Sequence, residues 1–293
     1  MKAAAAHTRT RFQNILFATD FSPAAEQAIP YIKKIAKYYQ SNVVALHVRP
    51  PLVSPIMAPT WPAEPETAKA EDQKHRKEIL QTFAGIPTLV LIKGGDIRSC
   101  LDSAIQDNSI DLLVIGTRGR TGIGKLLLGS VAEEIFRSVS CPVLTVGPHS
   151  DPSSGEFREI LYATDFSSES KEAAYAASLA QEFQARLILL HVVPEPKPGD
   201  LVSWSDVRES FEKLLRKLVP QEAEAWCKPE YFVERGEPAE RILDLANLRQ
   251  TDLIVLGAQC ETGFPGAATH LPIATAHKVV SHARCPVLTV RHQ

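Results

Sequence analysis

The sequence predicts an α/β fold in which one domain occurs twice in tandem. The segment Asn14–Ser22 (NILFATDFS) returns as Glu159–Ser167 (EILYATDFS) with seven of nine positions identical, and further pairs follow in the same order at offsets of 141 to 145 residues. A period of that length indicates a duplicated domain, because solenoid repeats run over about 20–50 residues. In both copies, short apolar runs alternate with longer segments of helical spacing, which predicts a five-stranded parallel sheet with helices on both faces.

The candidate strands are nearly continuous apolar runs, as expected of strands buried on both faces. In the first copy they cover Ile15–Thr19, Val43–Val48, Thr88–Ile92, Leu112–Gly116 and Val143–Val146, and in the second Ile160–Thr164, Leu187–Val193, Tyr231–Val233, Leu253–Gly257 and Val287–Val290. Helical spacing in the first copy covers Ala24–Tyr39, Glu66–Phe83, Arg98–Asn108 and Ser130–Ser138. The Gly, Pro and Ser-rich stretch Gly147–Phe157 has no apolar periodicity, so we expect domains at 1–147 and 158–293 with a linker at 148–157.

Composition narrows the class of protein. A formal net charge of −2 gives no electrostatic reason to expect nucleic acid or an anionic membrane as partner. No export or transmembrane segment is readable, and five cysteines without CxxC spacing favour a reduced, cytoplasmic protein.

The loop after the fourth strand of the first copy holds five glycines in fifteen residues, from Gly116 to Ser130, and a helix is expected from Val131. Glycines let the backbone approach a ligand closely, and a Gly-Ser pair at a helix start offers N–H groups, a positive dipole end and a hydroxyl to a phosphate. The alternative is that Gly129-Ser130 is only a helix cap and the other glycines form a flexible turn.

The spacing Gly116, two residues, Gly119, nine residues, Gly129-Ser130 matches the G-x2-G-x9-G-[S/T] signature of the ATP-binding branch of the universal stress protein family. The chain resembles that family in both copies, through ATDFS, the LHV and DLLVIG strands and CPVLTV. The resemblance implies two tandem Rossmann-like domains of the adenine nucleotide α-hydrolase-like class.

The resemblance also implies roles in ATP binding for residues of the first copy. Asp20 would face the adenine at a pocket edge shaped by Ala18 and Thr19, and the backbone of Val48 would read the adenine. Ribose and phosphates would meet the remaining positions, which are Gly116, Thr117, Gly119, Gly129, Ser130 and Val131. Mg²⁺ or Mn²⁺ is expected to accompany the triphosphate, with no dedicated metal ligand evident in the sequence. Whether Arg118 meets phosphate or is a solvated loop charge is left open.

Several of these residues have a plainer explanation. Asp20 could cap the helix that starts near Pro23, although Ser22 is better placed to do so. His47 and His191 occupy matching strand positions between apolar residues, which favours a buried histidine bonded to the backbone over a catalyst or metal ligand. Cys141 and Cys285 each precede a proline at the entry to the last strand, which favours a structural role.

The second copy departs from the signature. Cys260 replaces the second glycine, Ile273-Ala274 stand at the level of Gly129-Ser130, and the loop is three residues longer. We therefore expect the standard phosphate site to be absent there, and we interpret Asp165 as a remnant.

Three functions are compatible with these patterns: a regulatory ATP-binding stress protein, a slow ATPase or related nucleotide hydrolase, and a nucleotide-free interaction module. Hydrolases of this architecture carry an SGGxDS-like loop where this chain has Ala18–Pro23, which favours the first. In this family the last strands pair across a dimer, so Val143–Val146 and Val287–Val290 are expected to pair within the chain. Association into a homodimer stays open, and the protein partner and the stress signal are unknown.

Overall fold

The structure is a computed structural model and describes residues 11–49, 66–117, 135, 139, 141–150, 156–166, 171–196, 203–220, 226–258 and 273–291. Its strands in the first half are β1 (Asn14–Ala18), β2 (Asn42–Arg49), β3 (Thr88–Gly94), β4 (Leu112–Gly116) and β5 (Val143–Val146). Those in the second half are β6 (Glu159–Thr164), β7 (Arg186–Val193), β8 (Glu230–Arg235), β9 (Leu253–Ala258) and β10 (Val287–Arg291). Each half thus has the strands that its apolar runs predicted.

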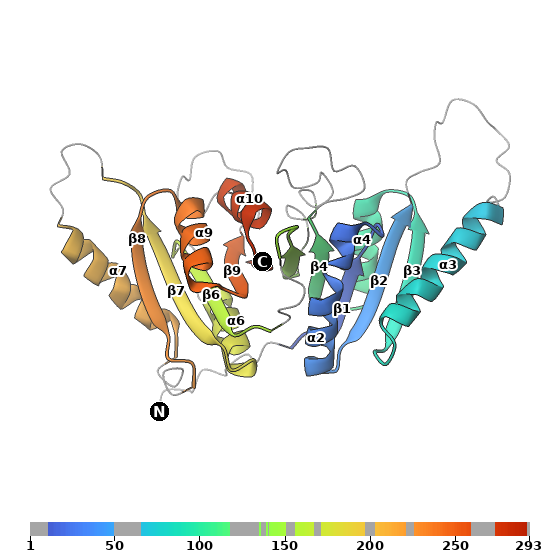
Figure 1. Ribbon diagram of the computed structural model, residues 1–293, viewed down its shortest axis with the longest axis horizontal. Coiled ribbons are helices and arrows are strands. Elements are labelled where there is room, and N and C mark those ends of the chain that lie inside the picture. The colour runs from blue at the N-terminus through green and yellow to red at the C-terminus, as the bar shows by residue number, and fades with distance from the viewer. Residues whose placement is uncertain are drawn as a thin grey trace, which may run out of the picture.

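All ten strands belong to one sheet, in the order β3-β2-β1-β4-β5-β10-β9-β6-β7-β8 (Figure 1). Neighbours within each half are parallel, whereas β5 and β10 are antiparallel and join the two halves. The predicted α/β fold with two parallel five-stranded arrays is confirmed. The pairing of the last strands within one chain is confirmed as well.

Helices cover both faces of the sheet. Buried side chains place on one face α1 (Pro23–Glu26), α2 (Ile29–Tyr39), α3 (Glu66–Thr82), α6 (Lys171–Glu182) and α7 (Trp204–Leu218). The other face carries α4 (Ile97–Asp107), α9 (Pro238–Arg249) and α10 (Ile273–His282). The apolar cluster on each face includes residues of both halves, so the core continues across the junction.

The prediction of a single helix over Ala24–Tyr39 is wrong, because a turn at Gln27 and Ala28 separates α1 from α2. Pro30, in the first turn of α2, has no N–H to offer the Glu26 carbonyl, and its ring would clash with that carbonyl in a continuous helix. The expected cap is confirmed: the backbone N–H of Ala25 donates to Ser22 Oγ (3.3 Å).

An aromatic cluster joins the two halves beside the sheet. The Phe12 ring packs edge-on to Tyr39 (5.5 Å between centroids) and stacks on Tyr175 of the second half (6.4 Å). The Phe157 and Phe183 rings meet edge-on at 5.0 Å. Phe157 is only 3% exposed although it stands at the end of the stretch predicted as linker, so its ring belongs to the shared core.

A second set of contacts between the halves is polar and lies at the end of α2. The Tyr38 hydroxyl donates to the Glu182 carbonyl oxygen (2.6 Å), and the Tyr39 hydroxyl donates to the Glu182 carboxylate. Both tyrosine hydroxyl groups therefore have a hydrogen-bond acceptor in the second half, while the two rings pack against Phe183 in the aromatic cluster.

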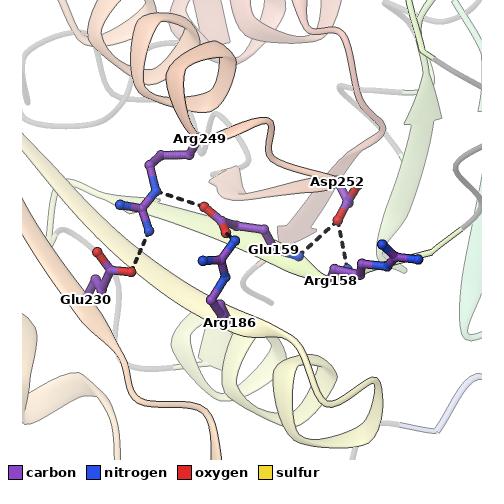
Figure 2. A network of polar contacts seen from close by, with 6 residues as sticks. All are labelled: Arg158, Glu159, Arg186, Glu230, Arg249 and Asp252. Carbon is purple, nitrogen blue, oxygen red and sulfur yellow. Dashed lines mark hydrogen bonds and ion pairs between the residues drawn. The ribbon is translucent and has the colours of Figure 1, made fainter.

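Polar side chains hold the amino-terminal ends of β1 and β6, and Figure 2 shows those around β6. Asp252 accepts the backbone N–H groups of Arg158 (2.8 Å) and Glu159 (3.0 Å). The Glu159 carboxylate is 2% exposed and pairs with Arg249 (2.9 Å) and with Arg186. The first half has an equivalent of the Asp252 contact, in which Asp111 accepts the backbone N–H groups of Gln13 and Asn14.

Asp111 Oδ2 lies 2.7 Å from the Gln13 nitrogen and 3.2 Å from the Asn14 nitrogen. Asn14 stands where the second half has Glu159, and it accepts the side-chain amide of Asn42 (3.0 Å) in place of an arginine. In both halves an aspartate thus accepts two backbone N–H groups at the start of the first strand. The neighbouring side chains differ, because the second half has charged groups where the first has amides.

Candidate functional site

The strand order reverses at β1, which lies between β2 and β4. Open α/β sheets bind ligands outside the carboxyl ends of the strands at such a point. Three neighbouring strands therefore bring the described candidate residues to one edge of the sheet. Ala18, Thr19 and Asp20 end or follow β1, Val48 lies near the end of β2, and Gly116 and Thr117 end or follow β4.

The remaining predicted site residues, Arg118, Gly119, Gly129, Ser130 and Val131, lie outside the described residues. The corresponding loop of the second half, 259–272, lies outside them too. The glycine spacing in this loop therefore stays a prediction from the sequence.

The turn after β1 is built from its own side chains. The backbone N–H of Phe21 donates to Thr19 Oγ1 (3.0 Å), and the backbone N–H of Ser22 donates to Asp20 Oδ1 (3.0 Å). The N-cap of α1 is Ser22, as the sequence predicted, and Asp20 is half-exposed before it. These bonds hold the Asp20 carboxylate at the edge where the strand order reverses.

Strand β2 supports this turn through a buried histidine. His47 is 8% exposed, and its Nδ1 donates to the Thr19 carbonyl oxygen (2.8 Å). His191 makes the same bond to Thr164 in the second half (2.8 Å), and burial lowers its pKa. The prediction of buried histidines bonded to the backbone is confirmed for both.

Gly116 is required by packing. A Cβ at this position would lie 2.5 Å from the Ala24 carbonyl oxygen and 2.9 Å from the Ala25 nitrogen, both of them backbone atoms of α1. A glycine here lets α1 and the Asp20 turn lie directly against the end of β4. Gly116 thus determines how closely α1 approaches the candidate site at the end of β4.

Thr117 continues β4 at the base of the glycine-rich loop. Its backbone N–H donates to the Val146 carbonyl oxygen (3.1 Å), and its side chain is 3% exposed. Its hydroxyl has no hydrogen-bond partner among the described residues. A buried hydroxyl without a partner carries a desolvation cost, which a ligand oxygen at this edge would relieve.

The equivalent edge of the second half differs in its described part. Glu172 stands 145 residues after Gln27, and its side chain is fully buried against the end of β9. A Cβ on Gly257 would lie 2.9 Å from Glu172 Oε1, whereas the three atoms nearest to a Cβ on Gly116 all belong to the backbone. The second half therefore places a buried carboxyl group beside the glycine that ends its strand, whereas the atoms nearest to the first-half glycine are backbone atoms of α1.

The cysteines in the described part of the chain are enclosed. Cys100, Cys141, Cys227 and Cys285 are buried free thiols, and burial raises the pKa of Cys227 to about 11 and that of Cys285 to about 12. This agrees with a structural role for Cys141 and Cys285. Within the described ranges, His, Cys, Asp and Glu form no group of three suited to a metal ion, and no helix is both long and apolar enough to cross a membrane.

Sequence reasoning missed two residues at this edge, Phe21 and His75. Phe21 is part of the ATDFS repeat and takes a left-handed backbone conformation (φ 59°). Its identity in both copies was a signal, but nothing in the pattern pointed to His75 as its neighbour.

Comparison with known proteins agrees with this architecture. The sequence model of the universal stress protein family matches residues 11–147 and 156–291. A universal stress protein of Mycolicibacterium smegmatis is 25% identical over 292 residues, covering 94% of this chain and 96% of that protein. The chain belongs to the universal stress protein family.

Solved structures show the same fold. The crystal structure of a universal stress protein from Archaeoglobus fulgidus aligns with a TM-score of 0.69 at 19% identity, covering 97% of this chain and all of the other. A putative universal stress protein from Pseudomonas aeruginosa aligns with a TM-score of 0.58 at 18% identity, covering 96% and 93%. Both alignments span the two halves.

Proposed function

We propose that this protein is a cytoplasmic, regulatory ATP-binding protein of the stress response, and that only its first domain holds the nucleotide. The observation that carries the proposal is the position of the ATP-binding signature. The signature begins at Gly116, at the end of β4. The neighbouring strand is β1, whose carboxyl end leads into Asp20, and the strand order reverses at β1. This is where an α/β sheet binds a nucleotide.

In this proposal each predicted site residue has a chemical task. Asp20 accepts the exocyclic amine of adenine, and the backbone of Val48 reads the adenine edge. The Thr117 hydroxyl takes a ribose or phosphate oxygen as its partner, while the Gly129-Ser130 helix start binds phosphate. Mg²⁺ or Mn²⁺ would be held mainly by the phosphates, since His, Cys, Asp and Glu among the described residues form no group of three suited to a metal ion.

The second domain is proposed to hold no nucleotide. Its loop lacks the glycines of the signature, and Glu172 adds a buried carboxyl group at the end of β9, which disfavours a phosphate nearby. The second domain then serves the fold, through β10 and the aromatic cluster.

Regulation by binding is favoured over turnover. His47 uses Nδ1 for the Thr19 carbonyl and is buried, so it is poorly placed to act as a general base. ATP would then act by shifting an equilibrium between states of different affinity for a partner.

Calorimetric titration with ATP and Mg²⁺, together with mass analysis of nucleotide released on denaturation, tests the proposal. We expect one site per chain. Gly129→Val should abolish binding because the signature needs close backbone approach, and Gly266→Val in the second loop is the matched control that should bind normally. Two sites per chain would refute the asymmetry, no binding would refute the function, and rapid ATP hydrolysis would favour the enzyme alternative.

A further inference from the structure

The residue after Asp20 is held in a conformation that costs free energy. Phe21 has φ 59°, a left-handed conformation that bulky residues seldom adopt, and Phe166 repeats it in the second half (φ 60°). A strained residue persists only where its surroundings hold it. Because Phe21 lies between Asp20 and Ser22, a contact that holds the Phe21 ring also holds the backbone of this turn, in which the Ser22 N–H donates to the Asp20 carboxylate.

The Phe21 ring packs against two histidine rings, those of His75 and His47. The Phe21 ring stacks on the His75 ring of α3, at 3.9 Å between centroids and 16° between planes. The same Phe21 ring meets His47 of β2 at 4.8 Å, and His47 bonds to the Thr19 carbonyl. The turn that contains Asp20 is therefore packed between β2 and α3.

Helix α3 is a firm support for this stack. On the turn before His75, Asp72 pairs with Arg49 of β2 (3.6 Å). Immediately after His75, Arg76 Nη1 donates to the Val90 carbonyl oxygen of β3 (3.0 Å). Both contacts tie α3 to the sheet, so the imidazole of His75 has a fixed place relative to the end of β1.

The second half keeps the stack with a different ring. Phe166 meets His191 at 4.7 Å and stacks on Phe211 of α7 at 5.9 Å and 20°. Phe211 thus does for Phe166 what His75 does for Phe21. The contact is preserved as an aromatic face, and the imidazole is not essential to its geometry.

We propose that His75 is a positioning residue for adenine recognition: by stacking on Phe21 it orients the Asp20 carboxylate and so sets the preference for ATP over GTP. The inference rests on the proposed function, in which Asp20 accepts the exocyclic amine of adenine. His75 acts through Phe21 and needs no contact with the nucleotide.

The experiment measures the affinities of the full chain for ATP and GTP in His75→Ala, His75→Phe and Asp20→Ala. His75→Ala should narrow the ATP preference about 2- to 10-fold, the size expected for one aromatic stacking contact. His75→Phe copies the second half and should keep the preference of the natural protein. Phe211→Ala removes the matching contact of the second half and should leave the preference unchanged.

A double variant separates positioning from general weakening. Since His75 acts through Asp20, adding His75→Ala to Asp20→Ala should narrow the preference no further. An unchanged preference in His75→Ala, or equal losses in His75→Ala and His75→Phe, would overturn the inference while leaving ATP binding intact. Absence of ATP binding by the natural chain would instead refute the proposed function.

Discussion

Leu144 of β5 lies directly opposite Leu288 of β10, at the centre of the antiparallel pairing that joins the two halves. On either side, Val143 faces Thr289 and Thr145 faces Val287, so the junction has local twofold character. Thr289 Oγ1 donates to the Val143 carbonyl oxygen (3.2 Å). Each last strand thereby covers an apolar edge of the other half, and neither half has that edge in contact with water.

Removing the second half should expose this edge. A chain that ends at Ser150 loses β10 and also the partners of Phe12 and Tyr39 in the aromatic cluster. Because an exposed apolar edge strand pairs with other copies, we expect the shortened chain to dimerise or aggregate in sedimentation experiments. A well-behaved monomer with full ATP affinity would contradict a structural role for the second half.

Gly116→Ala should destabilise the fold. Its Cβ would meet the Ala24 carbonyl at 2.5 Å, and backbone cannot move aside cheaply, so we expect a loss of about 1–3 kcal/mol in the free energy of unfolding, measured by denaturant titration. ATP binding should weaken as well, because α1 and the Asp20 turn would be pushed from β4.

Two glycines serve as controls for this substitution. Gly94→Ala meets no atom within 4 Å and should change stability by less than about 0.5 kcal/mol. Gly257→Ala meets the end of the Glu172 side chain, which can shift, and should fall between the two. Equal effects at all three positions would show that close packing at Gly116 is not the cause.

Phe157→Ala should be among the more damaging substitutions in the chain. The ring is buried in the cluster between the halves, and truncation leaves a cavity, so we expect a loss of about 3–5 kcal/mol. Leu248→Ala is the matched surface control: Leu248 is 79% exposed, and its truncation should cost less than about 0.5 kcal/mol. A small effect at Phe157 would mean that the cluster does not bind the halves together.

The sheet could be predicted from the sequence because strands buried on both faces appear as unbroken apolar runs. The start and end of β4 were predicted to the residue, whereas β8 extends beyond Tyr231–Val233, to Glu230 and Arg235. This strand forms one edge of the sheet, and its half-exposed polar ends carry no apolar signal. Phe157 was hidden for a related reason, since one apolar residue in a polar stretch has no period.

The edge with Asp20 and Thr117 could be predicted because chain order and strand order fix it. The stack of Phe21 on His75 could not, because it joins residues 54 positions apart in the sequence through a contact that follows neither a helix period nor a repeat. The break between α1 and α2 comes from Pro30, a single residue that leaves the apolar spacing intact, and that spacing alone predicts one helix.

Asp111 should make stability depend on pH. Burial raises the pKa of its carboxyl group from 3.8 to about 6, more than the two backbone N–H donors lower it. Between these values the folded chain binds more protons than the unfolded one, so this group's contribution to stability falls as the pH rises from about 4 to 6. The full shift would correspond to about 3 kcal/mol, and partial exposure reduces the expected effect to about 1–2 kcal/mol.

Asp111→Asn should therefore remove that fall, which is measured as the difference in unfolding free energy between pH 4 and pH 7 relative to the natural chain. Asp252→Asn changes the equivalent pair of hydrogen bonds, to the N–H groups of Arg158 and Glu159, and shows at pH 7 how much their weakening costs by itself. If Asp111→Asn keeps the same pH dependence as the natural chain across this window, then the backbone donors outweigh burial and the carboxylate is not destabilised in the fold.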